Sequence, residues 1–220
     1  AAGEYAHTLS TTDIMTGWWE GEAVMSRGQE AVCDALLATR GRYPFLWKEI
    51  HSDNGVEFIN GHLYRYTQKE GLGFSRSRPY KKNDNCLVEQ KNWTHVKKFV
   101  GYLRYDTGDE LEILNELYRN ELRLYKNFFQ PVMKLVSKER TGEKIKRKYD
   151  MPKTPYQRVI ELEGLSLKKK EELKKIYESL NPADLKRVID KNLAALHMVY
   201  QKKKQSPKVE PKKKQKPVTA

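Results

Sequence analysis

Cysteine is scarce in this chain of 220 residues, and its placement follows no recognisable pattern. Cys33 and Cys86 are the two cysteines, and neither belongs to a CxxC pair. A small secreted domain held by disulfides would need several cysteines at regular spacings. The sequence therefore indicates a reducing compartment, and we expect a cytoplasmic protein.

Long hydrophobic stretches are also missing. No run approaches the roughly 18 apolar residues of a transmembrane helix, and a signal-peptide pattern is lacking. His7, His62, His95 and His197 are scattered without the spacing of zinc ligands. We therefore expect neither a membrane partner nor a zinc site. The chain starts with Ala-Ala-Gly rather than Met, so we expect a fragment or a processed product.

Positive charge is abundant instead. Lys and Arg number 42 against 29 Asp and Glu, a formal net charge of +13. This surplus favours a polyanionic partner, nucleic acid before a membrane surface, although a highly charged soluble surface is the alternative. Residues 202–220 are rich in lysine and proline, so we predict a disordered tail that contacts phosphates without reading sequence.

The first hundred residues alternate strand-like and helical patterns. Expected strands cover 4–13, 16–24, 43–52 and 72–80, and expected helices cover 27–40, 61–71 and 87–103. Hairpin, helix, strand, helix, strand and helix form an α/β order with short connections. We therefore expect one α/β domain over residues 1–105.

The later residues are helical and basic. Leucines and aromatics recur with helical period over 109–130, and Asn181-Pro182 is a typical helix start. We expect a helical extension over 106–137, an extended basic connector over 138–165, a helical pair over 166–201 and the lysine-rich tail over 202–220.

Two carboxylates occupy positions that suit a metal site. Asp53 leaves the expected strand 43–52 in an Asp-Asn-Gly turn, and Glu89 lies 36 positions later on an expected helix. A strand–helix–strand–helix unit can return Glu89 to the end of the first strand, where paired carboxylates would suit Mg²⁺. On spacing alone, the simpler interpretation is that Asp53 caps a turn and Glu89 is a solvated helix charge.

The residues around both carboxylates resemble a known family. The segments HSDNGVEFIN (51–60) and SRPYKKNDNCLVEQKN (77–92) are similar to the catalytic core of retroviral-type integrases and bacterial insertion-sequence transposases. The resemblance covers residues 4–105, and the helical region beyond looks like the C-terminal extension of some bacterial transposases. The matched positions are Asp53, Asn54, Gly55, Glu57, Phe58, Asn60, Ser77, Arg78, Pro79, Tyr80, Asn83, Val88, Glu89, Gln90 and Asn92.

The resemblance implies a ribonuclease-H-like fold, a mixed sheet flanked by helices, with an Asp-Asp-Glu triad. Asp53 and Glu89 would be its last two members, separated by 35 residues, and would act as catalytic residues and ligands of Mg²⁺ or Mn²⁺. The implied reaction is phosphodiester hydrolysis and DNA strand transfer. The implied partners are transposon ends, target DNA and a second copy of the chain, in a bacterial cytoplasm at the nucleoid. A small-molecule substrate is not expected.

Side chains near Glu89 are the implied DNA contacts, through orientation of phosphate or neutralisation of the backbone. The candidates are Lys81, Lys82, Asn85, Lys91, Asn92, Lys97 and Lys98. For each of the four lysines outside the 85–92 stretch, a charged solvated surface is the alternative.

The first member of the triad has no counterpart. In the family it lies on the first strand of the sheet, ahead of the hairpin that begins here near Glu4. Asp13 falls at the hairpin turn, so we predict a turn residue rather than a metal ligand. We therefore predict that the first strand and first Asp are missing, and that the chain is inactive alone.

Two other functions stay open. One is a non-catalytic remnant of a decayed transposase that still binds nucleic acid through its charge and tail. The other is a basic RNA-binding protein of a different lineage, for which the paired motifs would be a coincidence.

Overall fold

The structure, a computed structural model, describes residues 4–53, 55, 61–78, 84 and 86–205. In that part the chain is a mixed α/β protein with three separate two-stranded sheets. The strands are β1 (His7–Thr12), β2 (Trp19–Val24), β3 (Glu49–Ser52), β4 (Gly73–Arg76), β5 (Leu135–Thr141) and β6 (Lys144–Tyr149). The mixed α/β class is confirmed, and the ribonuclease-H-like arrangement stays a prediction.

The helices lie where the period of the sequence predicted them, with additions near the C-terminus. They are α1 (Gln29–Gly41), α2 (Gly61–Lys69), α3 (Cys86–Lys91), α4 (Lys98–Val100), α5 (Gly108–Leu117), α6 (Pro155–Ile160), α7 (Leu167–Ser179) and α8 (Pro182–Gln205). Three π-helical segments interrupt this regularity: η2 (Asn92–Lys97), η3 (Tyr118–Leu122) and η4 (Tyr125–Phe129). The expected helices over 87–103 and 109–130 are thus nearly continuous helical runs with wider turns inside them.

The N-terminal hairpin forms as predicted. β1 pairs antiparallel with β2 along the full length of both strands. The carboxylate of Asp13 accepts hydrogen bonds from the Thr16 backbone N–H at 2.6 Å and from Thr16 Oγ1 at 2.7 Å. Gly17 follows with a φ of 77°, which glycine adopts without strain. Asp13 is therefore a turn residue.

The outer edge of β2 is closed by side chains rather than by another strand. The Asn127 amide accepts from the backbone N–H of Trp19 and donates to its carbonyl, both at 2.8 Å. The Asn115 amide bonds Ala23 in the same way, at 2.8 and 3.0 Å. Each amide supplies one acceptor and one donor to the exposed backbone. β2 is therefore a terminal strand, and a further strand could pair only on the β1 side.

β3 and β4 run parallel, connected by the crossover helix α2. The expected strand over 43–52 is shorter than predicted, because only Glu49–Ser52 pairs. A hydrophobic cluster below the hairpin joins this pair to β1 and α1. Its buried members are Leu9, Val32, Ala35, Leu36, Ile50, Leu63 and Leu72. The two small sheets therefore share a core although they belong to separate hydrogen-bonded ladders.

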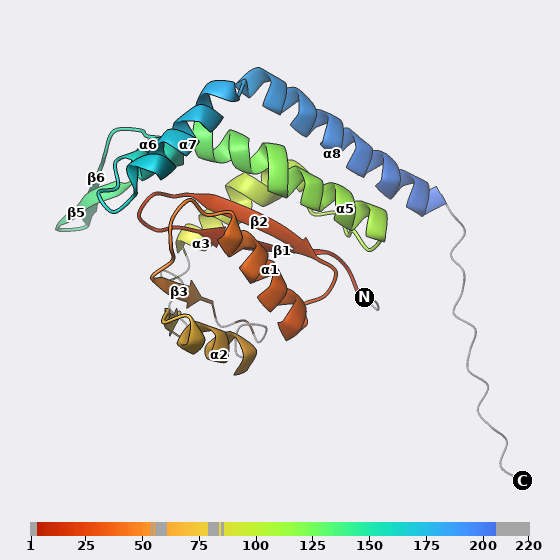
Figure 1. Cartoon of the computed structure of the whole chain (residues 1–220), viewed down its shortest axis with the longest axis horizontal. Coiled ribbons are helices and arrows are strands. Elements are labelled where there is room, and N and C mark those ends of the chain that lie inside the picture. Colours follow the sequence, from red (N-terminus) through yellow and green to blue (C-terminus); the bar gives the residue numbers. More distant parts are fainter. Residues whose placement is uncertain (1–3, 54, 56–60, 79–83, 85, 206–220) are drawn as a thin grey trace, which may run out of the picture.

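A second cluster holds the long helices against the hairpin. Figure 1 shows α5 lying along β2, with α8 outside it. The buried members are Trp19, Ala23, Val96, Val100, Tyr105, Leu114, Leu117, Tyr118, Leu122, Ile189 and Leu196. The helices beyond residue 106 thus pack directly on the N-terminal hairpin.

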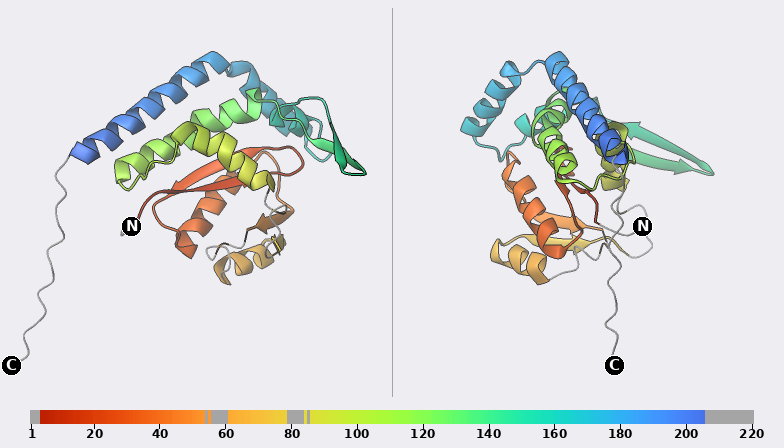
Figure 2. Two further views of the ribbon diagram at one scale, coloured as in Figure 1. Left: turned by 180° about the vertical axis from the view of Figure 1, so that it is seen from behind. Right: turned by 90° about the vertical axis from the view of Figure 1, so that its right-hand side faces the viewer.

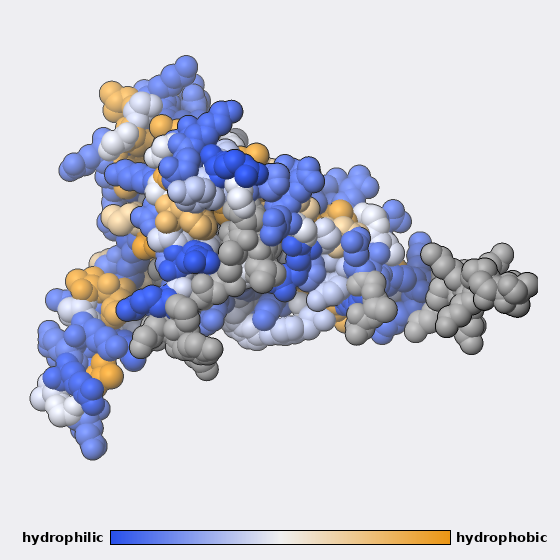
Figure 3. Space-filling model, turned by 90° about the horizontal axis from the view of Figure 1, so that it is seen from below, coloured by the Kyte–Doolittle hydropathy of each residue, from blue (hydrophilic) through white to orange (hydrophobic). Residues whose placement is uncertain are grey.

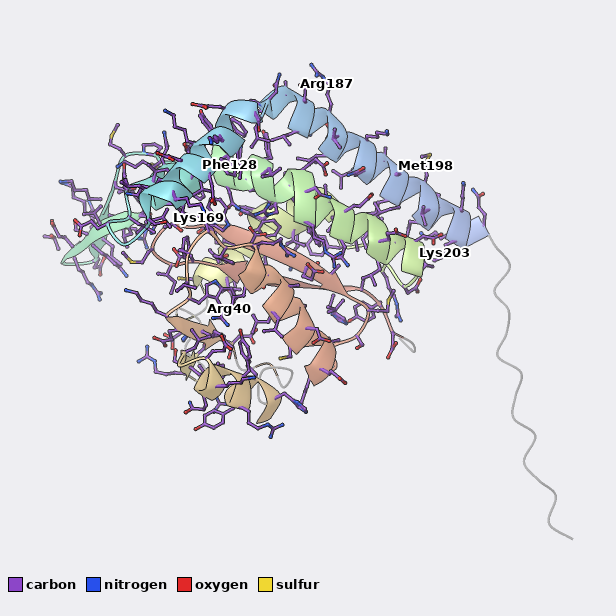
Figure 4. The ribbon with its side chains drawn as sticks, viewed as in Figure 1. Arg40, Phe128, Lys169, Arg187, Met198 and Lys203 are labelled. Atoms are coloured by element: carbon purple, nitrogen blue, oxygen red, sulfur yellow. The ribbon has the colours of Figure 1, made fainter. Side chains whose placement is uncertain are left out.

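The C-terminal helices are fixed at both ends. Phe128, labelled in Figure 4, lies near α6 and α7. It stacks on Tyr156 with ring centroids 5.1 Å apart, and Tyr156 stacks on Tyr177 at 4.9 Å. At the other end, Lys203 Nζ lies 2.7 Å from Glu110 Oε1 and 2.8 Å from Asp106 Oδ1. α8 therefore continues to Gln205, so the start of the predicted 202–220 tail is helical; residues 206–220 lie outside the described part.

The described residues contain no helix with the length and apolar composition needed to span a bilayer.

The prediction of an extended connector without regular secondary structure over 138–165 is wrong. Residues 135–149 form the antiparallel hairpin β5–β6, and α6 follows. Gly142 and Glu143 connect the strands, and Gly142 adopts a φ of 62° that suits glycine in a tight turn. The hairpin projects away from the helices (Figure 2).

A buried carboxylate ties the hairpin to the helices. Glu20, on β2, is fully buried. Arg123 Nε donates to its two oxygens at 2.9 and 2.8 Å, and Arg42 Nε donates at 3.0 Å. The Trp18 indole N–H adds a bond of 2.9 Å. Burial raises the pKa of Glu20, and these donors oppose the rise. The carboxylate thus joins β2, the end of α1 and the helix after α5.

We predict that Glu20→Gln lowers the free energy of unfolding by about 3–5 kcal/mol, because it leaves two guanidinium groups without this buried counter-charge. Urea unfolding measures the loss. The exposed Glu116→Gln is the matched control and should change stability by less than about 0.5 kcal/mol. Equal effects of the two substitutions would contradict the structural role of Glu20.

Candidate functional site

Asp53 lies directly beyond the carboxyl end of β3. Its side chain is exposed, and Oδ1 accepts a hydrogen bond from the Gly55 backbone N–H at 3.0 Å. This bond is the turn-capping interaction that the simpler interpretation expected. It orients the carboxylate at the surface, so capping and ligand binding are compatible.

The exposed face beside Asp53 carries a chain of hydrogen bonds. His51 Nδ1 lies 2.8 Å from Ser75 Oγ, and its Nε2 lies 3.2 Å from Ser77 Oγ. Ser75 Oγ also donates to Glu49. His51 therefore ties β3 to β4 and fixes the strand that ends just before Asp53. The face seen from below, which includes the β3–β4 side, is mostly hydrophilic (Figure 3).

An ion pair between Arg78 and Asp84 joins the segment after β4 to the segment before α3. Arg78, two residues beyond β4, donates through Nε and Nη2 to both oxygens of Asp84, at 3.0 and 2.9 Å. Its backbone N–H adds a bond of 3.0 Å to the same carboxylate. Hydrogen bonds from Arg78 hold the pKa of Asp84 well below its usual range, and His51 contributes to this shift. The start of α3 is thus held near the carboxyl ends of both strands.

Glu89 lies on α3 with its side chain exposed. Lys97 and Lys98, further along the same helical run, are also exposed, and Asn92 is half-buried. Three predicted DNA contacts, Lys81, Lys82 and Asn85, lie outside the described residues. The structure therefore leaves Glu89, Lys97 and Lys98 open to a ligand.

The metal site predicted at Asp53 and Glu89 stays a prediction. Among the described residues, no group of three or more His, Cys, Asp and Glu side chains could hold a metal ion. A site of two carboxylates is smaller than such a group.

Lys91 points inward, which the sequence did not indicate. It is buried, and its Nζ has no hydrogen-bond partner among the described residues. A Cβ added to Gly17 would lie 3.9 Å from Nζ, so the amino group lies beside the hairpin turn. Burial, together with Lys126 and Lys134, lowers the pKa of Lys91 to about 8. This position argues against the predicted DNA contact by Lys91.

A pocket of about 500 Å³ lies beside the π-helical segment η2. Asn92 and Lys97, both predicted DNA contacts, are among its lining residues. Lys97 Nζ lies 5.0 Å above the Tyr102 ring, and Arg104 lies 4.8 Å above the Tyr5 ring. Cations next to aromatic rings suit phosphates and stacked bases. The sequence could not show this pocket, because its walls come from distant segments.

Comparisons with known proteins give a sequence relative and a weak structural likeness. No family model matches the chain. The uncharacterized protein y4rM of Sinorhizobium fredii (strain NBRC 101917 / NGR234) is 37% identical over 158 residues. The match covers 72% of this chain and 45% of that protein, so the chain spans less than half of its relative.

The structural likeness is to the catalytic core domain of BIV integrase. It has a TM-score of 0.44 and 16% sequence identity, and it covers 68% of this chain and 82% of that one. A likeness this weak carries no argument about activity.

We predict that Lys91→Met raises the free energy of unfolding at pH 7, because it removes a buried charge that lacks a partner. The folded-state pKa of about 8 lies below the usual 10.5, so the folded protein loses this proton first. The native lysine therefore becomes less costly between pH 8 and 10.5, and the advantage of Lys91→Met should shrink there by about 2–3 kcal/mol. Chemical denaturation across this range measures it, and an advantage independent of pH would contradict the prediction.

Proposed function

We propose that this chain is part of an enzyme of the integrase and transposase kind, which cuts and joins DNA at phosphodiester bonds. The observation that carries the proposal is the pair Asp53 and Glu89, separated by 35 residues and set in matched sequence on a β3–α2–β4–α3 unit. Parallel strands present their carboxyl ends at one edge, where α/β proteins bind ligands. Asp53 lies at that edge.

The two carboxylates fit a hard divalent ion. Asp53 and Glu89 are exposed oxygen donors, which Mg²⁺ and Mn²⁺ prefer. When bound, the ion would supply Lewis-acid activation of an attacking oxygen and neutralise charge on the phosphodiester. A third carboxylate, from residues outside this chain, would complete the set.

Other side chains would support the carboxylates. The ion pair between Arg78 and Asp84 holds the approach to α3 at the edge of β3 and β4. His51 would keep β3 in register with β4, because its ring bridges serines of the neighbouring segment. Lys97, at the end of η2, and Lys98, at the start of α4, are exposed and would neutralise DNA phosphates.

The pairing of β1 supports the ribonuclease-H-like fold, because β2 is its strand partner among the described residues and its other edge is left without one. β2 is closed by Asn115 and Asn127, whereas β1 shares a hydrophobic cluster with β3 without pairing to it. A strand between β1 and β3 would join both pairs into one mixed sheet. We propose that this strand carries the missing Asp, that the partner is DNA, and that the working enzyme contains more than one copy.

We predict that Asp53→Asn and Glu89→Gln each weaken Mn²⁺ binding to this chain, because each removes one charged ligand. Isothermal titration with Mn²⁺ measures binding, and Glu116→Gln should leave it unchanged. In a longer chain that includes the upstream residues, the same substitutions should lower Mg²⁺-dependent strand transfer by more than about 100-fold.

The outcomes separate the proposed enzyme from its alternative. Strand transfer that survives both substitutions would refute the assigned site. Activity in this chain alone that is lost with Asp13→Ala would refute the assignment of Asp13 to the turn. Duplex DNA binding without any Mn²⁺ binding would favour the non-catalytic remnant.

A further inference from the structure

The β5–β6 hairpin, here called the basic ribbon (residues 135–149), makes no contribution to the core. Every side chain on its two strands is exposed except Ser137, which is half-exposed. It carries six basic residues against two acidic ones. The basic residues are Lys138, Arg140, Lys144, Lys146, Arg147 and Lys148. An isolated two-stranded ribbon gains little stability from packing. Because the basic residues do not help to build a core, we look for their role in binding a partner.

The strand register divides the basic ribbon into two different faces. Lys138 lies opposite Arg147, and Arg140 lies opposite Ile145, so these four side chains share one face that has no acidic residue. The other face pairs Lys146 with Glu139 across the strands. Like charges directly opposite each other destabilise a ribbon. The pairing of Lys138 with Arg147 therefore leaves an unbalanced positive face.

The base of the basic ribbon is firmly held. The Asp150 carboxylate accepts from the Lys134 backbone N–H at 2.6 Å and from Arg158 Nη1 at 2.7 Å. Arg158 Nη2 also donates to the Val132 carbonyl at 2.9 Å. Lys134 Nζ donates to the carbonyl of Ile14 in the N-terminal turn, at 2.6 Å. The ribbon thus projects in a direction fixed by α6 and the N-terminal hairpin (Figures 1 and 2).

We propose that the basic ribbon binds in the major groove of duplex DNA, with the face of Lys138, Arg140 and Arg147 toward the bases. This groove admits a two-stranded ribbon, and arginine is the commonest side chain in contact with guanine there. Ile145, on the same face, could contact a thymine methyl group. The inference deepens the proposed function and rests on it for DNA as the partner.

Shape distinguishes DNA from the other polyanions. The strands are 7 and 6 residues long, about 20 Å, which matches the contact length of roughly half a turn of duplex. The major groove of A-form RNA is too narrow for side chains to read. A ribbon that acts in the groove should therefore prefer duplex DNA to duplex RNA, whereas a simple polycation should not.

We predict that the double substitution Lys138→Gln with Arg147→Gln weakens binding to a 20-base-pair DNA duplex at least tenfold. Fluorescence anisotropy in EDTA at fixed salt measures binding by the full chain. The matched control is Lys146→Gln with Lys148→Gln, which removes the same charge from the opposite face and should cost less than threefold. The lysine-rich C-terminus is present in every variant, so its contribution cancels. The same chain should bind duplex RNA of that sequence at least tenfold more weakly.

Equal losses for the two double variants, no loss in either, or equal affinity for duplex RNA would each overturn the proposal. Folding does not confuse the result, because all four side chains are exposed and the unfolding midpoint can be checked. The exposed Glu116→Gln, outside both the ribbon and the assigned site, should bind DNA normally in EDTA. If the ribbon variants behave as expected and strand transfer is absent from the longer chain, the proposed enzyme fails while the ribbon inference holds.

Discussion

The fully buried carboxylate of Glu20 is the constraint from which the arrangement of this chain follows. It takes hydrogen bonds from Arg42 after α1 and from Arg123 in the helix that continues α5. A buried charge is tolerated only when its donors converge on it, so these segments have one relative placement. That placement sets Asn115 and Asn127 against the outer backbone of β2. It leaves β1 facing the parallel pair that carries Asp53.

Much of this architecture could be predicted from periodicity. The N-terminal hairpin, α1, α2 and the long helix after residue 108 all have one apolar side, and their patterns identified them. The basic ribbon was missed because both of its faces lie in solvent, so its sequence shows no apolar alternation. The π-helical segments were missed because an extra residue in a turn leaves little trace in composition.

The sequence alone identified the two candidate carboxylates, but it did not identify the contacts around them. Asp53 and Glu89 came from a spaced motif, and the structure places both at the surface. The ion pair between Arg78 and Asp84 depends on how the chain folds between the two residues, and the spacing of residues in the sequence does not predict that. Lys91 lies two positions after Glu89 on α3. Its side chain is buried beside the N-terminal turn because that side of α3 packs inward, which the sequence does not show. Charge alone could not distinguish it from Lys97.

The two asparagines on β2 also bear on how copies of this chain meet one another in concentrated solution. An uncovered strand edge recruits identical edges and promotes aggregation. Because helical amides occupy the positions of a neighbouring strand, two copies cannot join through β2. Edge-to-edge pairing through the basic ribbon is opposed by mutual repulsion of its lysines and arginines. The side-chain amides of Asn115 and Asn127 therefore oppose aggregation through β2, in addition to fixing the helices against it.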